Sequence, residues 1–339
     1  LFVIRNHLEM SRYANKFDLD DPEVIDSFAQ FIEGEQRLRF LYVHTFCDAN
    51  ATAPDLWNDH KEELHTQLFV NTLNVLEGKH ARKDPSVLKN AYTEIEVEGV
   101  PKNELIEHLD QVPERYFSHA GKEEVALHVD MVHRFAHNGN NSGKPILSWR
   151  NDVRRTLTIV DIVTRDRPAL FEKIAGGFSV AGLNILGARA VTRKDGIAID
   201  VFYVEGEKGG IVNDAKTRAL CESSIHDFLE NETSPDQLIK EKRKKTDNNR
   251  PFSNEDRLGE RIPPSVDVYH DVSLARIIVE VRASDQVGLL HLIAKTISRC
   301  GFSIQFARVA TEQGIATDIF NIEKSTDGKK FSPSQFLQL

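Results

Sequence analysis

Two stretches in the second half of the chain show the same order of hydrophobic patterns. Residues 156–163 and 275–281 are β-branched runs of strand length. Each run is followed by apolar residues at helical spacing, which predicts an amphipathic helix. These residues are Leu170, Ile174, Phe178, Leu289, Ile293 and Ile297. We expect the helices to end at Gly182 and Gly301, because glycine tolerates the left-handed conformation that commonly closes a helix.

The two stretches are copies of one another. Leu170 and Leu289 are 119 positions apart, and the same spacing relates Ala188-Arg189 to Ala307-Arg308. After a one-residue deletion, Gly196-Ile197-Ala198 reappears as Gly314-Ile315-Ala316. A repeat of this length exceeds the period of about 20–50 residues that is typical of solenoids. It therefore indicates a duplicated small domain.

Each copy is predicted to fold as strand, helix, strand, strand and helix, with a closing strand. In the first copy, strands 185–192 and 197–204 are joined by Asp195-Gly196, a strong hairpin signal. We expect a helix over 213–231 and the closing strand at 265–270. In the second copy, the helix begins near 331 and the closing strand is expected beyond Leu339. This order is ferredoxin-like, so the fold class is α+β.

The first 150 residues have a helical pattern throughout. The predicted helices span 22–32, 37–50, 57–76 and 123–135. Asp21-Pro22-Glu23 is a helix start, with proline in the first turn and acidic groups that complement the helix dipole. The predicted organisation is an all-helical region at 1–150, one repeat at 154–272 with a charged insertion or linker at 232–264, and a truncated repeat at 273–339.

Composition excludes several classes of protein. A net charge of −9 argues against non-specific nucleic-acid binding, which needs a basic surface. No run approaches 18 consecutive apolar residues, and Leu1-Phe2-Val3-Ile4 is followed at once by Arg5, so we expect neither a membrane span nor a leader. The three cysteines are far apart, which fits a reducing cytoplasm. For the lysine-rich segment 240–245, a solvated linker and an anion contact both remain possible.

The segment Asp166-Arg167-Pro168-Ala169-Leu170-Phe171, directly after a strand, resembles the ACT family of small regulatory modules. The resemblance implies paired domains that bind an amino acid near the first loop and the helix start. Helix-start N–H groups suit its carboxylate, and an aspartate suits its ammonium. The candidate ligand-binding residues are Asp166, Arg167, Asn184, Asp285, Gln286 and Ser303. The alternative is that Asp166 and Asp285 are helix N-caps.

A series of motifs in the helical region widens the resemblance. They are Asn6-His7-Leu8-Glu9-Met10-Ser11, Asp18-Leu19-Asp20-Asp21-Pro22, Thr45-Phe46-Cys47-Asp48-Ala49-Asn50-Ala51-Thr52, Leu56-Trp57-Asn58-Asp59-His60-Lys61 and Val112-Pro113-Glu114-Arg115-Tyr116-Phe117. In this order and before two ACT-like repeats, they resemble the bifunctional uridylyltransferase/uridylyl-removing enzymes, which modify the PII signalling protein. That family ends in an HD-type hydrolase domain and two ACT domains. The resemblance implies that this chain is roughly the C-terminal half.

The resemblance also implies part of a metal site. Asp48 matches the final aspartate ligand of the HD arrangement, and His7 lies in the family's Asn-His-Leu motif. In the parent enzyme such ligands hold Mg²⁺ or Mn²⁺, which activates water against a phosphodiester. The adjacent His-Asp pair that defines HD hydrolases is absent, since Asp59-His60 has the reverse order. No stretch carries the Gly-Ser pair together with the Asp-x-Asp of the nucleotidyltransferase domain, so we expect the fragment alone to be inactive.

Two function classes follow from this resemblance. In the first, the chain is the regulatory half of a cytoplasmic enzyme that transfers UMP from UTP to PII and removes it again, with L-glutamine as the effector. In the second, it is a non-catalytic amino-acid sensor with a helical adaptor. An ACT pair attached to a metabolic enzyme such as a dehydrogenase is disfavoured, because no glycine-rich dinucleotide loop follows a strand.

Overall fold

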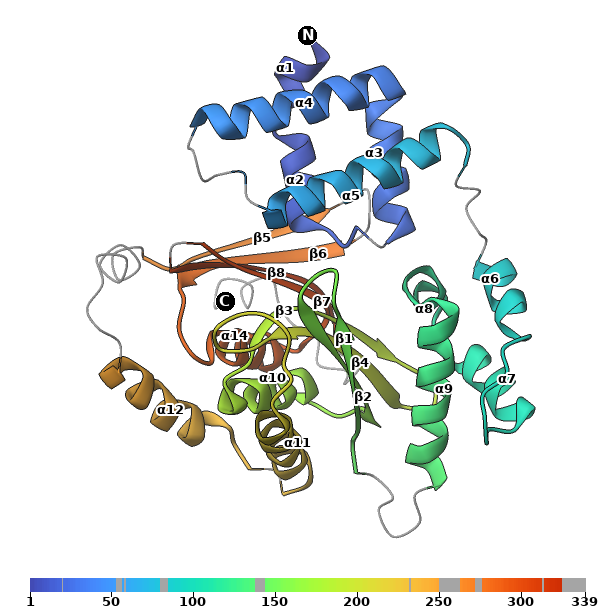
Figure 1. Cartoon of the computed structure of the whole chain (residues 1–339), viewed down its shortest axis with the longest axis vertical. Coiled ribbons are helices and arrows are strands. Elements are labelled where there is room, and N and C mark those ends of the chain that lie inside the picture. Colours follow the sequence, from blue (N-terminus) through green and yellow to red (C-terminus); the bar gives the residue numbers. More distant parts are fainter. Residues whose placement is uncertain are drawn as a thin grey trace. The chain divides into compact units, whose positions relative to one another are not determined.

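The structure is a computed structural model (Figure 1). It describes residues 1–19, 21–52, 57, 59–79, 85–137, 144–231, 233–249, 263–271, 276–312 and 314–324. The chain divides into two compact units. The N-terminal unit comprises residues 1–95 and 114–125, and the sheet unit comprises 96–113, 126–271 and 276–339. None of the described helices is long and apolar enough to cross a membrane.

The N-terminal unit is helical, as predicted. Its helices are α1 (Phe2–Asn6), α2 (Glu9–Lys16), α3 (Pro22–Ile32), α4 (Glu35–Thr52), α5 (Asp59–Leu76), α6 (Pro85–Tyr92) and α8 (Glu114–His119). The predicted start of α3 is confirmed, because the side chain of Asp21 accepts a hydrogen bond of 2.9 Å from the N–H of Glu23. The helices enclose a core that includes Phe17, Phe28 and Leu38, each with no exposed surface.

The sheet unit is built on one antiparallel eight-stranded sheet. Its strands are β1 (Ile146–Asp152), β2 (Leu157–Arg165), β3 (Asn184–Thr192), β4 (Ile197–Glu205), β5 (Ser265–Asp271), β6 (Arg276–Ser284), β7 (Phe302–Glu312) and β8 (Ile315–Lys324). Their order across the sheet is β1-β2-β4-β3-β7-β8-β6-β5. The mixture of helices and antiparallel strands confirms the α+β class.

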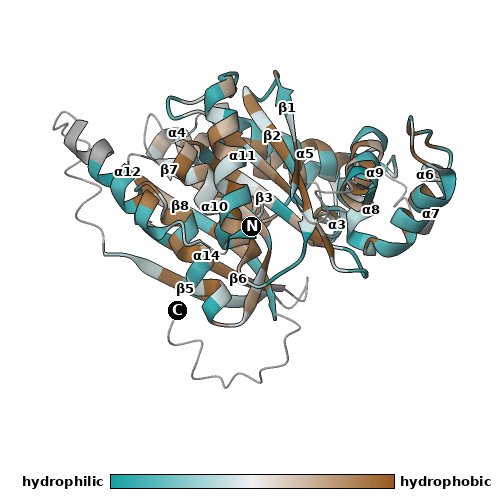
Figure 2. Ribbon diagram, turned by 90° about the horizontal axis from the view of Figure 1, so that it is seen from below, coloured by the Kyte–Doolittle hydropathy of each residue, from teal (hydrophilic) through white to brown (hydrophobic). Residues whose placement is uncertain are grey.

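The helices of this unit are α7 (Lys102–Gln111), α9 (Lys122–His137), α10 (Leu170–Ala181), α11 (Ala215–Glu230), α12 (Asp236–Asn249) and α14 (Leu289–Arg299). The first residues of α9 belong to the N-terminal unit, and the helix is part of the sheet unit from Ala126 onward. One sheet face packs against α10, α11 and α14 in a continuous apolar core, which contains Phe178, Phe202 and Phe320. Figure 2 shows apolar residues along these strands and helices. In the segment predicted to be a linker or insertion, residues 236–249 form the helix α12.

The two repeats join at the centre of the sheet through β3 and β7. Ala188 pairs with Ala307, and Gly187 and Arg189 pair with Arg308 and Phe306 on either side. Ala188 and Ala307 are equivalent positions of the repeat, 119 residues apart. A residue that pairs with its own equivalent marks a two-fold axis, as in the self-complementary interface of a homodimer. The duplication therefore forms an internal pseudo-dimer.

The edge strands differ from the prediction. Strand β5, which contains the residues 265–270 predicted to close the first repeat, pairs instead with β6 of the second repeat. The edge position of the first repeat is taken by β1, which pairs with β2. The second repeat, whose closing strand was expected beyond Leu339, therefore has four described strands in the sheet, β5, β6, β8 and β7. The segment at 331–337, predicted to be a helix, lies outside the described residues.

The second sheet face carries a buried ionic contact beneath α9. Asp161 on β2 has no exposed surface, and Arg150 donates to its two carboxylate oxygens at 2.8 and 2.7 Å. His128 of α9 lies with Nε2 3.3 Å from Oδ1 of the same group. Burial alone raises the pKa of Asp161, but the hydrogen bonds from His128 and Arg150 outweigh it and leave this pKa lowered. The contact fixes α9 on the sheet.

Candidate functional sites

The predicted ligand-binding residues of each repeat lie at opposite ends of the sheet. Asp166 follows Arg165, which pairs with Ile197 at the start of β4, whereas Asn184 pairs with Glu205 at its end. Strand β4 has nine residues, so these two ends are about 26 Å apart at roughly 3.3 Å per residue. In the second repeat, Ser303 likewise pairs with Glu323 and lies away from Asp285. No single repeat brings its three predicted residues together.

The pseudo-two-fold axis regroups them across the repeats. Because β3 and β7 run antiparallel about Ala188 and Ala307, the start of β3 lies at the same sheet end as the end of β7. Strand β7 ends at Glu312, which pairs with Ile315, and Ile315 in turn pairs with the last residue of β6. One end of the sheet therefore carries Asn184, Asp285 and Gln286, and the other carries Ser303, Asp166 and Arg167. Each set draws on both repeats.

The helix-cap interpretation of Asp166 and Asp285 is wrong. Helices α10 and α14 begin after Ala169 and Gly288, which adopt the left-handed conformation with φ of 61° and 81° and provide no side-chain cap. The backbone N–H groups of Asp166 and Asp285 instead donate to the carbonyls of the opposite hairpins, Gly196 and Gly314, each at 2.8 Å. This places each aspartate beside a hairpin turn, several residues before the helix.

Arg167 and Asn184 make contacts within the first repeat. The guanidinium Nη1 of Arg167 donates to the carbonyl of Leu229 at 2.5 Å, at the C-terminal turn of α11. The amide of Asn184 donates to Glu205 Oε1 and to the carbonyl of Gly206 over 3.4 and 3.5 Å. A bond to a helix-terminal carbonyl is a structural role, whereas bonds this long leave Asn184 able to change partners.

Each repeat contains a second acidic group that was not among the predicted site residues. Asp200 on β4 and Asp318 on β8 are 4% and 1% exposed and face the apolar core beside Phe202 and Phe320. Burial, followed by the nearby charges of Asp166 and Asp285, raises the pKa of each carboxyl to about 8. Both acids are therefore protonated at neutral pH. An acidic residue at an inward position of an apolar strand was the available signal.

Helix α12 lies over the seam between the repeats. Asp236 contacts Lys295 and, at 3.0 Å, Nε2 of His291, whose Nδ1 is 2.9 Å from the carbonyl of Glu172. Glu172 and His291 are equivalent positions, 119 residues apart, so they meet at the pseudo-two-fold axis. The hydrogen bonds from Lys295 and His291 lower the pKa of Asp236. Asp236 thus ties α12 to α14, while His291 ties α14 to α10.

Further along, α12 reaches the sheet end that carries Asn184 and Asp285. Lys242 donates to the carbonyl of Val180 at 3.0 Å, and Arg243 donates to that of Val287 at 2.9 Å. A side chain at Gly288 would overlap Ile239, which is 3% exposed. Helix α12 therefore packs on the loop that contains Gln286 and Val287. The lysine-rich segment binds backbone carbonyls here, which is a structural role for two of its cations.

The predicted metal ligands His7 and Asp48 belong to the N-terminal unit. His7 has Nδ1 3.0 Å from the carbonyl of Ile4, and its ring centroid is 5.9 Å from that of His44. Asp48 is exposed on α4, one turn beyond His44. Within the described part of the chain, no group of three metal-ligand atoms includes His7 or Asp48. These two described side chains do not by themselves complete a Mg²⁺ or Mn²⁺ site, because Mg²⁺ takes about six oxygen ligands, of which several are usually water.

Comparison with known proteins places these features in a family. The chain is 29% identical to the bifunctional uridylyltransferase/uridylyl-removing enzyme of Phenylobacterium zucineum over 98% of its length, which covers 34% of that protein. It is 30% identical to the enzyme of Caulobacter vibrioides, over 97% of the chain and 34% of that protein. It is also 30% identical to the enzyme of Ralstonia nicotianae, over 100% of the chain and 38% of that protein. No family model matches the chain. The chain belongs to the family of bifunctional uridylyltransferase/uridylyl-removing enzymes and spans about a third of the length of these relatives.

Proposed function

We propose that this chain is the C-terminal regulatory part of a cytoplasmic enzyme that transfers UMP from UTP to the PII signalling protein and removes it by hydrolysis. In this proposal the two repeats are ACT domains that sense L-glutamine, and the N-terminal unit is the end of an HD-type hydrolase domain. The similarity to the relatives over 97–100% of the chain supports the assignment, together with the two activities for which these enzymes are named.

The observation that carries the sensing role is the pairing of the repeats about Ala188 and Ala307. This pairing gathers residues of both repeats at each end of the sheet, so that a ligand there contacts both domains at once. A free amino acid carries an ammonium and a carboxylate. Asp285 suits the ammonium, and the first N–H groups of α14, after Gly288, suit the carboxylate.

We assign no hydrolytic step to this chain by itself. His7 and Asp48 are two contributors to the Mg²⁺ or Mn²⁺ site that the family resemblance implies, and the remaining ligands would belong to another part of the enzyme. Asp48→Asn in the complete enzyme is therefore the informative change, because it removes a ligand without changing the shape of the side chain. We expect it to abolish UMP removal from PII and to spare transfer.

Isothermal titration calorimetry with glutamine and glutamate tests the sensing role on the whole chain. We expect glutamine to bind, and Asp285→Ala and Asn184→Ala each to weaken binding by about 2–4 kcal/mol, since a buried ammonium or carboxylate would lose its partner. Asp214→Ala, which removes the N-cap of α11, is the matched control and should leave the affinity unchanged. Absence of glutamine binding to the intact chain would refute this role.

The incomplete set of metal ligands keeps a second candidate in view, a non-catalytic amino-acid sensor with a helical adaptor. Incubation of PII with UTP and the complete protein distinguishes the two. Labelling of PII that changes with glutamine supports the enzyme. Glutamine binding without labelling or removal supports the sensor.

A further inference from the structure

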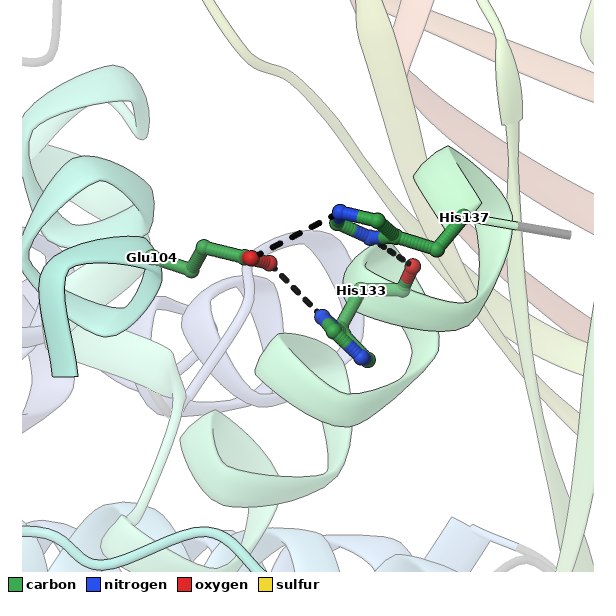
Figure 3. A group of neighbouring side chains, drawn as sticks. All are labelled: Glu104, His133 and His137. Carbon is green, nitrogen blue, oxygen red and sulfur yellow. Dashed lines mark hydrogen bonds and ion pairs between the residues drawn. The ribbon is translucent and has the colours of Figure 1, made fainter. Parts of the chain in front are cut away.

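Three side chains of types that can ligate a metal converge in the sheet unit. They are Glu104 on α7 and His133 and His137 on α9 (Figure 3). Nδ1 of His133 lies 2.7 Å from Oε2 of Glu104, and Nε2 of His137 lies 3.7 Å from Oε1. One ligand atom from each of the three residues falls within 4.8 Å of the other two.

The helical spacing explains why the histidines meet. Residues four apart lie on the same helix face, and the rings of His133 and His137 are 4.4 Å apart between centroids. Nδ1 of His137 is 2.9 Å from the carbonyl of His133, which can only accept a hydrogen bond. The hydrogen of a neutral His137 is therefore on Nδ1, and the lone pair of Nε2 faces Glu104. A backbone carbonyl that fixes the tautomer in this way is typical of histidines that bind metals.

A simple ion pair accounts for only part of this arrangement. Glu104 and His133, each about a quarter exposed, satisfy one another at 2.7 Å. The second histidine directs an acceptor nitrogen at the same carboxylate, an orientation that a shared cation would make favourable. Two imidazoles and one carboxylate form the ligand set of open zinc sites, whereas Mg²⁺ and Ca²⁺ prefer oxygen ligands.

We propose that Glu104, His133 and His137 form a binding site for a divalent transition metal, with Zn²⁺ as the best match. Small rotations of the three side chains bring their ligand atoms to the distances of about 2.0–2.2 Å that Zn²⁺ requires. Three protein ligands leave a fourth position for water or another small ligand. The site belongs to a single compact unit, so it does not depend on the placement of the N-terminal unit.

The metal would link α7 to α9. Helix α7 is also attached to the β3–β4 hairpin, because Arg193 is 3.1 Å from Nδ1 of the buried His108, and Lys194 donates its N–H to the carbonyl of Gln111 at 3.0 Å. Burial, followed by the charge of Arg193, keeps the pKa of His108 well below its usual value, so this ring is a neutral acceptor. A bound metal thus restrains a helix attached to the hairpin opposite Asp166.

The test measures Zn²⁺ binding to the whole chain, purified without an affinity tag and stripped with EDTA. Competition with a chromophoric chelator gives the affinity, and Co²⁺ substitution gives a visible absorption band that reports the ligands. We expect one Zn²⁺ per chain. His137→Ala and His133→Ala should each weaken the Zn²⁺ affinity by about 100-fold, and Glu104→Gln should weaken it by about 10-fold or more. These values follow the losses of affinity that result when the groups around a bound metal are disturbed.

The control is His226→Ala, because His226 also forms a helical His–Glu pair, 3.7 Å from Glu230, without a second histidine. It should leave the affinity and the Co²⁺ band unchanged. Because the side chain of His137 is 57% exposed, His137→Ala should fold normally, and without metal its melting temperature should equal that of the wild type. Added Zn²⁺ should raise the melting temperature of the wild type and of His226→Ala, but not that of His137→Ala. Equal Zn²⁺ affinities for the wild type and a His133→Ala/His137→Ala double variant would overturn the proposal.

Discussion

The buried acids Asp200 and Asp318 predict an unusual dependence of stability on pH. Their pKa values are about 8 in the folded chain and near 3.8 when unfolded, so the folded state holds an extra proton at each position between these limits. A raised pKa of an acid means that stability falls as pH rises from about 4 to about 8, and changes no further above that range. Each acid contributes a slope of about 1.4 kcal/mol per pH unit.

Between pH 4 and pH 8 this slope lowers the unfolding free energy by at most about 6 kcal/mol per acid. The value is an upper limit, because relaxation and water entry reduce the cost of a buried charge. The perturbation is Asp200→Asn or Asp318→Asn, which keeps the shape and removes the titration. Each variant should flatten the dependence of the unfolding free energy on pH by about 1.4 kcal/mol per unit between pH 5 and 7. At pH 8, each should be more stable than the wild type.

Urea unfolding at pH 5, 6, 7 and 8 measures this slope. The chain has two tryptophans, and a Trp57→Phe background leaves Trp149 on β1 as the fluorescence reporter of the sheet unit. Asp214→Asn is the control, because hydrogen bonds from Thr217 and Lys216 lower the pKa of this exposed cap and give it the opposite sign. Its stabilisation is present above the unfolded pKa and is lost as pH falls. A slope unchanged in Asp200→Asn would show that the core accepts the charge.

Two further changes test the packing of the sheet unit. Asp161→Ala leaves Arg150 and His128 without their carboxylate and should lower the unfolding free energy, measured in urea, by about 2–4 kcal/mol. The loss is somewhat smaller than for a fully buried pair, because the side chain of Arg150 is 35% exposed. Asp130→Ala is the control, since it removes only an exposed ion pair with Arg134 and should change stability little. Gly288→Ala should lower the unfolding free energy by about 2 kcal/mol or more, because the new side chain combines a positive φ with overlap on Ile239. Gly314 also has a positive φ but faces open space, so Gly314→Ala should cost about 1 kcal/mol. Equal losses of stability in the two variants would argue against close packing of α12.

Local patterns predicted the elements of this fold well because their signals are local. The period of the apolar residues identified α10 and α14, and the offset between the copies identified the duplication. The partner of a strand is not encoded in its period. Strand β5 has the alternation of an edge strand, but whether it closes the repeat before it or the one after it depends on which sheet edge the chain reaches.

The spatial grouping of the candidate ligand residues could not be predicted from the sequence for a related reason. Asp166 and Asn184 are 18 positions apart in the sequence, yet they lie at opposite ends of β4. Only the pairing of β3 with β7 shows that Asn184 belongs with Asp285 of the other repeat. The inward position of Asp200 on β4 was a local signal, but its role depends on how deeply the packed helices bury the carboxyl, which the strand pattern does not reveal.

The duplication produced two similar backbones whose seam is not symmetric. Asp236 of α12 binds His291 and Lys295, whose equivalents in the first repeat are Glu172 and Gly176. Placed against the first repeat in the equivalent way, Asp236 would face a carboxylate and no cation, which is unfavourable. The seam thus fixes the orientation of α12, and only the sheet end with Asn184 and Asp285 receives the contacts of Lys242 and Arg243. Two ends with the same strand geometry therefore offer different surroundings to a ligand.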